Sequence, residues 1–156
     1  MEILRMKKMT LSFIVFTLFC GSLFGQQKEF GLGFMVGSPT GISAKYWVSG
    51  TNALDFGLGY SFAKDNSNLN FHADYLWHDA SLFNSPQKLL FHYGCGIRLK
   101  TVVDGRNSFG ARGVAGISWF PSHTPFEFFI EVAPVFKLIP ETALDVDGGL
   151  GARFYF

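Results

Sequence analysis

Ionisable side chains recur at alternate positions of short segments in this 156-residue chain. Twelve of them would share one face if those segments are strands: Lys45, Asp55, His72, Asp74, His92, Arg98, Arg112, Glu127, Glu131, Asp145, Asp147 and Arg153. Apart from the two histidines, four carry a positive and six a negative charge. A charge buried without a partner is costly, so enclosed charges of both signs pair with one another. The pattern predicts an internal ion-pair network more than a reaction centre.

The four histidines, at positions 72, 78, 92 and 123, are the residues best suited to acid–base or metal chemistry. His72 and Asp74 point the same way on a strand but about 7 Å apart, which does not make a hydrogen-bonded dyad. Metal ligation by His72 and His92 across two strands is an alternative that we do not favour. We therefore expect no catalytic residue, no cofactor and no metal, and the chain is predicted not to be an enzyme.

The first 25 residues have the three-part pattern of a secretory signal peptide. Positive charges at residues 5–8 precede an apolar run of about 11 residues, and small residues follow as far as Gly25. The run is shorter than the roughly 20 residues that a membrane-spanning helix needs. We expect cleavage near Gly25, leaving residues 26–156 as one domain. An uncleaved anchor and a lipoprotein site at Cys20 are the alternatives.

The composition narrows the possible partners and stabilising links. Cleavage would leave Cys95 as the only thiol, which excludes an intramolecular disulfide and a metal site built on cysteines. Charged residues make up only 16% of the chain and form no basic stripe, so nucleic acid is not an expected partner. The 19 phenylalanines and 18 glycines are both far above ordinary usage.

The apolar residues repeat with a period of two. In residues 53–63, Leu54, Phe56 and Leu58 alternate with Asp55 and Gly57, so a strand there has one apolar and one polar or glycine face. Eight segments share this pattern: 28–37, 42–49, 53–63, 69–77, 89–100, 109–120, 126–138 and 144–156. Short turns between them favour an all-β, eight-stranded antiparallel up-and-down transmembrane β-barrel.

Three segments fit an eight-stranded barrel less well: the first two, 28–37 and 42–49, are the weakest spans, and the seventh contains a proline. The segment 42–49 is short, and Pro134 removes a backbone donor from the seventh segment.

The direction of the apolar face decides between a membrane barrel and a soluble one. A soluble lipocalin-like barrel or sandwich would carry about 25% charged residues on a solvated outer face. Here the non-apolar face is mostly Gly, Ser and Ala, which suits a cramped interior. Aromatic residues gather near predicted strand ends, as in outer-membrane barrels: Phe30, Tyr46, Tyr75, Trp77, Phe109, Trp119, Phe126, Phe128, Phe154 and Phe156. We expect outer-membrane lipid to contact the apolar face.

Three motifs carry a resemblance: Gly37-Ser38-Pro39-Thr40-Gly41-Ile42-Ser43-Ala44-Lys45-Tyr46-Trp47, the alternating run 53–62, and His72-Ala73-Asp74-Tyr75-Leu76. The sequence resembles a family of small, functionally uncharacterised bacterial outer-membrane barrels, spirochaetal members included, similar in size to the OmpA transmembrane domain. The resemblance implies that fold and location, and no catalytic residues. The final Phe154-Tyr155-Phe156 looks like the C-terminal signature recognised by the barrel-assembly machinery, which is therefore an expected partner.

The orientation follows from the last strand. If Phe156 and the mature N-terminus face the periplasm, so do the turns 49–52, 78–88 and 121–125. The longest connection, 78–88, is then periplasmic, which weakens an adhesin built on long outer loops. We predict a monomeric barrel with a plugged interior and a structural or partner-binding role, its ligand unidentified. The alternatives are a narrow pore, a surface binder of host or environmental ligands and a lipid-modifying enzyme.

Overall fold

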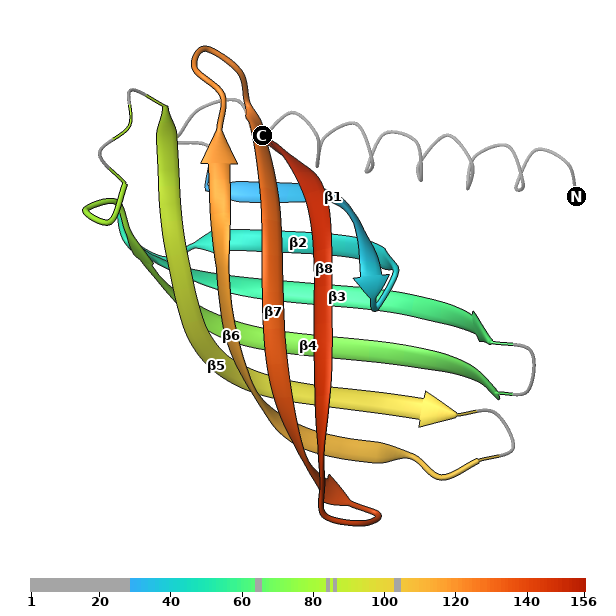
Figure 1. Ribbon diagram of the computed structural model, residues 1–156. Helices are drawn as coiled ribbons and strands as arrows, with labels where there is room; N and C mark the ends of the chain where they lie inside the picture. Colours follow the sequence, from blue (N-terminus) through green and yellow to red (C-terminus); the bar gives the residue numbers. More distant parts are fainter. Residues whose placement is uncertain (1–28, 64–65, 84, 86, 103–104) are drawn as a thin grey trace, which may run out of the picture.

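The chain forms a closed barrel of eight antiparallel strands (Figure 1). The computed structural model describes residues 29–63, 66–83, 85, 87–102 and 105–156. The strands are β1 (Phe30–Ser38), β2 (Gly41–Trp47), β3 (Asn52–Ala63), β4 (Asn66–Asp79), β5 (Lys88–Val102), β6 (Ser108–Phe120), β7 (Phe126–Ile139) and β8 (Ala143–Tyr155). Each strand pairs with its sequence neighbours, and β8 pairs back with β1. The predicted fold class is confirmed.

The predicted signal segment 1–25 lies outside the described residues. Within those residues, no helix is long and apolar enough to cross a membrane.

The strand ends differ most from the prediction at β4. The predicted segment 69–77 extends in the structure from Asn66 to Asp79. His78 therefore belongs to the strand, and continued alternation turns it inward, where it is buried. The long connection predicted at 78–88 shortens to the residues between β4 and β5. Its first turn is closed by the Ser81 backbone N–H, which donates to Asp79 Oδ1 at 2.7 Å.

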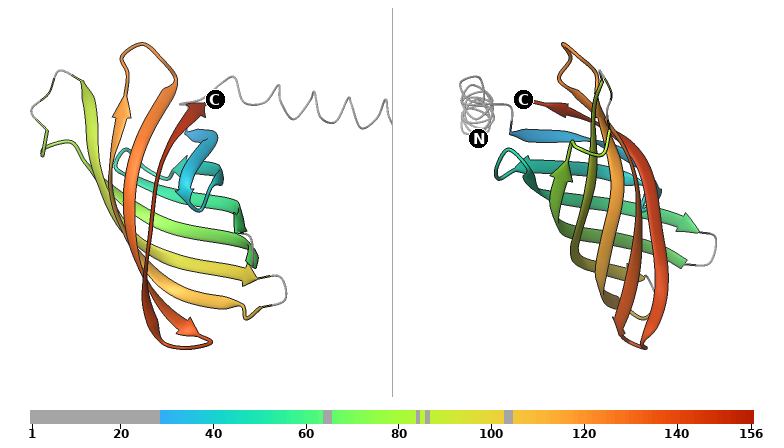
Figure 2. Two further views of the ribbon diagram at one scale, coloured as in Figure 1. Left: turned by 45° about the vertical axis from the view of Figure 1, so that its right-hand side comes forward. Right: turned by 60° about the vertical axis from the view of Figure 1, so that its left-hand side comes forward.

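The wall is uneven around the barrel. Strands β1 and β2 have 9 and 7 residues, whereas the other six have 12 to 15, and Figure 2 shows the long strands extending past the short pair. The pairing of β6 with β7 skips Gly113 and Val114. Pro134 lies opposite this interruption, because proline has no backbone N–H to donate. On its other side, Pro134 still aligns with Val146 of β8.

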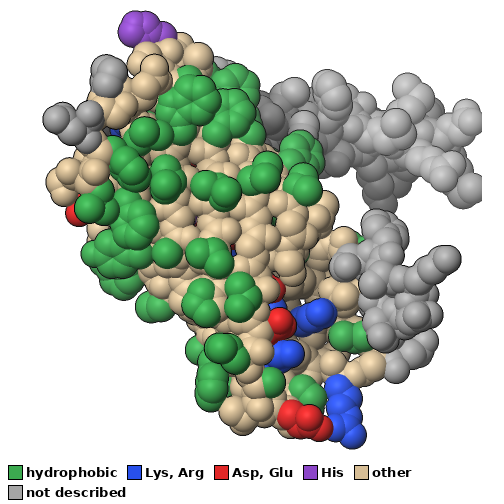
Figure 3. Space-filling view, in the orientation of Figure 1, with side chains coloured by type: hydrophobic (Ala, Val, Ile, Leu, Met, Phe, Trp, Pro, Cys, Tyr) green, Lys and Arg blue, Asp and Glu red, His purple; other side chains and the backbone are tan. Residues whose placement is uncertain are grey.

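The two faces of the wall have opposite chemistry. Large apolar side chains point outward, Phe34 being 74% and Leu144 72% exposed, and Figure 3 shows hydrophobic side chains spread over the visible wall of the barrel. Among the described residues, the cluster of buried hydrophobic side chains inside has three members, Leu76, Val114 and Ala133. The largest fully buried side chains are instead arginines, Lys45 and histidines. This distribution is the inverse of that in a water-soluble protein.

Glycines make room for the large inward side chains. His72 and His92 lie directly across the strand pairs from Gly57 and Gly116. A Cβ atom on either glycine would collide with the imidazole ring opposite. The narrow interior therefore holds these imidazole rings because each one faces a glycine on the neighbouring strand.

Candidate functional site

The candidate site is the charged interior. Eleven of the twelve residues that the sequence groups on one face are buried, and Asp145 is the exception, with 37% of its side chain exposed. They come from seven of the eight strands, β2 to β8. Ion pairs link them across the barrel as well as along neighbouring strands, and they divide into two clusters.

The Glu127 cluster is built on one carboxylate that accepts four hydrogen bonds. Lys45 Nζ and Ser118 Oγ each donate to Oε1 at 2.6 Å. Arg153 Nη1 at 3.2 Å and the Tyr155 hydroxyl at 2.7 Å donate to Oε2. Such charge-assisted hydrogen bonds are the strong ones. Each carboxylate oxygen accepts two hydrogen bonds, so Glu127 links β2, β6, β7 and β8 inside the barrel.

Arg153 is the second anchor of the Glu127 cluster. Its Nη2 lies 2.6 Å from Asp55 Oδ1, and its Nε donates to Ser43 Oγ at 2.8 Å. The guanidinium plane rests 3.8 Å from the ring centroid of Phe129, a cation–π contact. Counting Lys45, Asp55, Glu127 and Arg153, the cluster has two charges of each sign and is neutral.

The Arg112 cluster is the second group and lies on β4, β5, β6, β7 and β8. Arg112 Nη2 donates to Glu131 Oε1 at 2.9 Å, while its Nε lies 2.9 Å from Asp74 Oδ2. The second contact is an ion pair without hydrogen-bond geometry, since both atoms lack a hydrogen-bond partner among the described residues. Arg112 Nη1 is 3.6 Å from Asp147 Oδ2, which is likewise unsatisfied.

Arg98 extends the Arg112 cluster toward one rim of the barrel. Its Nη1 donates to Asp147 Oδ1 at 2.7 Å and its Nη2 to Asp145 Oδ2 at 2.9 Å. Lys137 Nζ lies 3.5 Å from the same Asp145 oxygen. Arg98 and Arg112 face four carboxylates in this cluster, those of residues 74, 131, 145 and 147, so two negative charges are in excess. Lys137 offsets one of them at the rim.

His72 lies where the two clusters meet. Its Nε2 is 3.9 Å from Asp55 Oδ2 in the Glu127 cluster and 4.0 Å from Asp74 Oδ2 in the Arg112 cluster. Neither ring nitrogen of His72 has a hydrogen-bond partner among the described residues. His72 and Asp74 thus face one another, at a separation beyond hydrogen-bond distance.

A serine–histidine pair is the arrangement closest to catalytic chemistry. Ser118 Oγ lies 3.2 Å from His92 Nδ1, but the same hydroxyl donates to Glu127. Both residues are almost completely buried. A nucleophile must reach its substrate, and this hydroxyl is enclosed and already engaged, so the pair is a packing contact. His123 is exposed in the turn between β6 and β7 and takes no part in this pair.

Several interior residues were not among those predicted. His78 approaches Lys45 Nζ at 3.3 Å and packs against the Trp47 ring, 4.4 Å between centroids. Ser43, Ser118 and Tyr155 supply hydrogen bonds to the Glu127 cluster. All four have the inward parity of their strands, so the period of two identifies them once polar as well as charged residues are considered.

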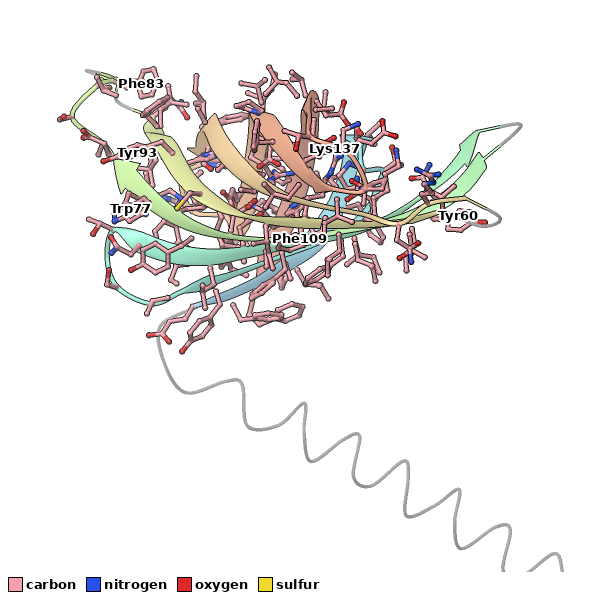
Figure 4. The ribbon with its side chains drawn as sticks, turned by 90° about the horizontal axis from the view of Figure 1, so that it is seen from below. Tyr60, Trp77, Phe83, Tyr93, Phe109 and Lys137 are labelled. Carbon is pink, nitrogen blue, oxygen red and sulfur yellow. The ribbon has the colours of Figure 1, made fainter. Side chains whose placement is uncertain are left out.

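An aromatic belt surrounds one end of the barrel, the end where β1 begins and β8 finishes. Ring contacts join Tyr75 to Trp77 and Trp77 to Tyr93 at centroid separations of 5.0 and 5.9 Å. Phe126 and Phe154 make a further edge contact at 5.4 Å. Trp77 and Tyr93 lie at this end in Figure 4, and Tyr60 lies at the other.

A hollow of about 610 Å³ lies at the opposite end, beside the short β1–β2 hairpin. The turn residues 37–41 form one side, and Leu58 and Gly59 form part of another. Asn70 and Lys100 add polar groups to the lining. The hollow exists because β1 and β2 end before the neighbouring strands do.

Comparisons with known proteins bear on the fold. The N-terminal β-barrel domain of Pseudomonas aeruginosa OprF aligns with a TM-score of 0.56 and 17% identity, over 81% of this chain and 94% of that one. The chain has the fold of that domain. Neisserial surface protein A, at 16% identity and TM-score 0.47, and the Yersinia pestis attachment invasion locus protein Ail, at 14% and 0.44, are weaker likenesses, each over 81% of this chain and over 94% and 96% of theirs.

No family model and no curated protein sequence matches the chain. The resemblance to the uncharacterised family of barrels therefore stays a prediction.

Proposed function

We propose that the chain is a bacterial outer-membrane β-barrel with a structural or partner-binding role and an interior closed by its ion pairs. The observation that carries the proposal is the inverted distribution of side chains. Large apolar residues face outward around the whole wall, and eleven of the twelve charged or histidine residues predicted to face inward are buried. A sheet of this kind, closed so that it has no free edge, is stable in lipid.

The closed interior argues against a channel. An eight-stranded barrel is just wide enough for its own side chains to fill. Here Lys45, Glu127 and Arg153 meet inside the barrel through hydrogen bonds of 2.6 and 3.2 Å. Breaking such a buried pair is strongly unfavourable, so these groups do not move aside for ions. The same enclosure supports a non-enzymatic role, since the Ser118–His92 pair cannot meet a substrate.

The aromatic belt and the last strand support the proposed orientation. Interfacial belts of Trp, Tyr and Phe anchor barrels at the edges of the bilayer. Phe154 and Phe156 point outward at this end, with ring centroids 5.1 Å apart. We infer that this end faces the periplasm, that the assembly machinery binds this pair, and that the protein acts as a monomer after residues 1–25 are removed.

The first experiment tests location and processing. The full chain would be expressed in a Gram-negative host, and the envelope fractionated. We expect an outer-membrane protein whose gel migration changes on heating and whose mass corresponds to a chain beginning near Gln26. A product that stays soluble and monomeric in the periplasm without detergent would contradict the proposal.

The second experiment tests the closed interior. The purified barrel, reconstituted in planar bilayers, should give no single-channel conductance above baseline. The matched variants are Lys45→Ala, which removes one of the buried charges from the interior, and Arg106→Ala, at a pair that is 77% and 82% exposed. Stepwise conductance of the unmodified protein would favour the narrow-pore alternative.

A second candidate, binding of a small polar ligand at the outer surface, is favoured by the hollow beside the β1–β2 hairpin. Its lining combines Asn70 and Lys100 with exposed backbone of the turn. NMR spectra of the detergent-solubilised barrel, recorded with a panel of small anions and sugars, should show shifts confined to residues such as Gly41 and Gly59. A panel that shifts none of these amides would count against this candidate.

A further inference from the structure

Three buried side chains converge where the Glu127 and Arg112 clusters meet. One oxygen each from Asp55 and Asp74 and one ring nitrogen of His72 all lie within 4.8 Å of one another. We propose that Asp55, His72 and Asp74 form a binding site for one divalent transition-metal ion such as Zn²⁺ or Co²⁺. The inference is independent of the proposed location and role of the barrel, and it replaces the expectation that the chain holds no metal.

The distances between the three side chains suit a shared metal ion better than direct hydrogen bonds. His72 Nε2 is 3.9 Å from Asp55 Oδ2 and 4.0 Å from Asp74 Oδ2, too far for hydrogen bonds. Metal bonds of about 2.0–2.2 Å place two ligand atoms of a tetrahedral ion roughly 3.4 Å apart. To reach that separation, the two histidine–carboxylate distances would have to close by about half an ångström, and the two carboxylate oxygens, which lie within 4.8 Å of each other, by up to about 1.4 Å.

The ligand atoms are held in orientations that leave them available. Arg153 Nη2 takes Asp55 Oδ1 at 2.6 Å, so Oδ2 is the oxygen left facing His72. Asp74 Oδ2, the oxygen that faces His72, lies 2.9 Å from Arg112 Nε, and neither oxygen of Asp74 has a hydrogen-bond partner among the described residues. Neither ring nitrogen of the fully buried His72 has one either, and a buried polar group of this kind requires an explanation. Partners that fix a ligand's orientation are a regular feature of metal sites.

The strands around the triad leave space for it. Gly57 lies directly across from His72, and Gly96 directly across from Asp74. A Cβ atom on Gly57 would collide with the imidazole, and one on Gly96 would collide with the Asp74 carboxylate. No side chain from these two positions therefore competes for the ligand atoms.

The charge of the surroundings favours a cation. The Glu127 cluster is neutral, whereas the Arg112 cluster has two more carboxylates than guanidinium groups, with Lys137 near the outermost of them. A divalent ion beside Asp74 would offset that excess. One imidazole and two carboxylates suit Zn²⁺, Mn²⁺, Fe²⁺ or Co²⁺, whereas Mg²⁺ and Ca²⁺ prefer oxygen ligands alone.

The test uses Co²⁺ and Zn²⁺ as probes. Because the triad is enclosed, the full barrel would be refolded into detergent from denaturant with the ion present, and unbound metal then removed. We expect one Co²⁺ per barrel with visible d–d absorption. This absorption should be absent when the barrel is refolded with Zn²⁺ in place of Co²⁺. His72→Gln should lower the affinity by more than about a hundredfold, beyond the effect of removing a group that only orients a ligand.

His92→Gln is the matched control. His92 is equally buried and also lies across from a glycine, but its Nδ1 contacts Ser118 and it belongs to no ligand cluster among the described residues. Metal binding should survive this change. Heat-modifiable migration verifies that each variant has folded. If His72→Gln does not fold, NMR of the unmodified protein decides: Zn²⁺ must shift the His72 ring signals and leave those of His92 in place. Absence of retained metal, or equal retention by His72→Gln, would overturn the proposal.

Discussion

The Glu127 and Arg112 clusters are both buried, yet their polar atoms are satisfied to different extents. Glu127 accepts four hydrogen bonds in a cluster with two charges of each sign. In the Arg112 cluster, Arg112 Nε and Nη1, both oxygens of Asp74 and Asp147 Oδ2 lack hydrogen-bond partners among the described residues. In the Glu127 cluster, Asp55 Oδ1 is the atom that lacks one, and it has Arg153 Nη2 at 2.6 Å as an ion-pair partner. A neutral network with few unsatisfied atoms rigidifies a barrel interior, whereas one with more of them and excess negative charge has capacity for a further cation.

Replacing one carboxylate by an amide in each cluster should give the largest difference in stability between the two clusters. Glu127→Gln leaves Lys45 and Arg153 with one negative charge too few and places amide hydrogens against their donors. Removing one partner of a buried pair costs about 3–5 kcal/mol, and we expect a loss of that order. The free energy of unfolding, measured in urea with detergent-folded barrel, reports it.

Glu131→Gln is the counterpart in the Arg112 cluster. Arg112 keeps the carboxylates of Asp74 and Asp147, and the excess negative charge falls by one. The unfolding free energy should therefore change by less than about 1 kcal/mol, in either direction. Equal losses for the two variants would show that the clusters do not differ as described.

The two clusters also show which features of the interior the sequence predicts and which it does not. A period of two assigns each residue of a strand to one face, and this placed Asp55, Glu127 and Arg153 together without a structure. It does not give the register or the contacts across the barrel. The contact of Lys45 on β2 with Glu127 on β7 depends on closure and on side-chain length, which no local pattern encodes.

The ends of the strands were also predicted less well than their faces. Ending the fourth strand at residue 77 left His78 in a turn, whereas pairing continues to Asp79 and places that ring inside against Lys45. Pairing partners on both sides extend a strand beyond the residues whose own pattern is clear, and boundaries depend on those partners. The His72 junction was missed for a related reason: its two carboxylates come from different strands, and only the register Asp55 with Asp74 brings them together.

A methyl group added beside His92 or His72 tests how firmly each ring is held. A Cβ on Gly116 would meet the Ile130 carbonyl as well as His92, which is held by Ser118. Gly116→Ala should therefore destabilise the barrel by about 1–3 kcal/mol, the usual cost of overpacking. Thermal or urea unfolding of the folded barrel measures it.

Gly57→Ala is the matched change at the junction. The three atoms nearest its added Cβ all belong to the His72 ring, which has no hydrogen bond to lose. The ring can shift, so the loss of stability should be smaller than for Gly116→Ala. A larger loss would mean that His72 is held more firmly than its contacts indicate. Gly113→Ala, where the nearest atom is 3.9 Å away, controls for the substitution itself.

Removing single hydroxyl donors compares the clusters at finer scale. The Tyr155 hydroxyl donates to Glu127 at 2.7 Å inside the barrel, and the Ser38 hydroxyl to Asp147 at 3.2 Å in a part-buried position. Tyr155→Phe should cost about 1.5 kcal/mol, the lower end for a bond to a charged group. Ser38→Ala should cost less, because water can replace its hydroxyl. Equal costs, measured by urea unfolding, would argue that Glu127 does not depend on its fourth donor.

The smallest effect is expected at an ion pair outside both clusters. Arg106 Nη1 lies 3.7 Å from Glu141 Oε1, and the two side chains are 77% and 82% exposed. Exposed pairs gain little because water and salt already stabilise each charge. Arg106→Ala should therefore leave the unfolding free energy within about 0.5 kcal/mol of the unmodified protein, at low and at high salt. A loss approaching that of Glu127→Gln would mean that charge pairing itself stabilises this barrel. A negligible loss for Arg106→Ala together with a large loss for Glu127→Gln would assign the stabilisation to buried pairs. In such pairs, removing one side chain leaves a charged partner unpaired and out of contact with water.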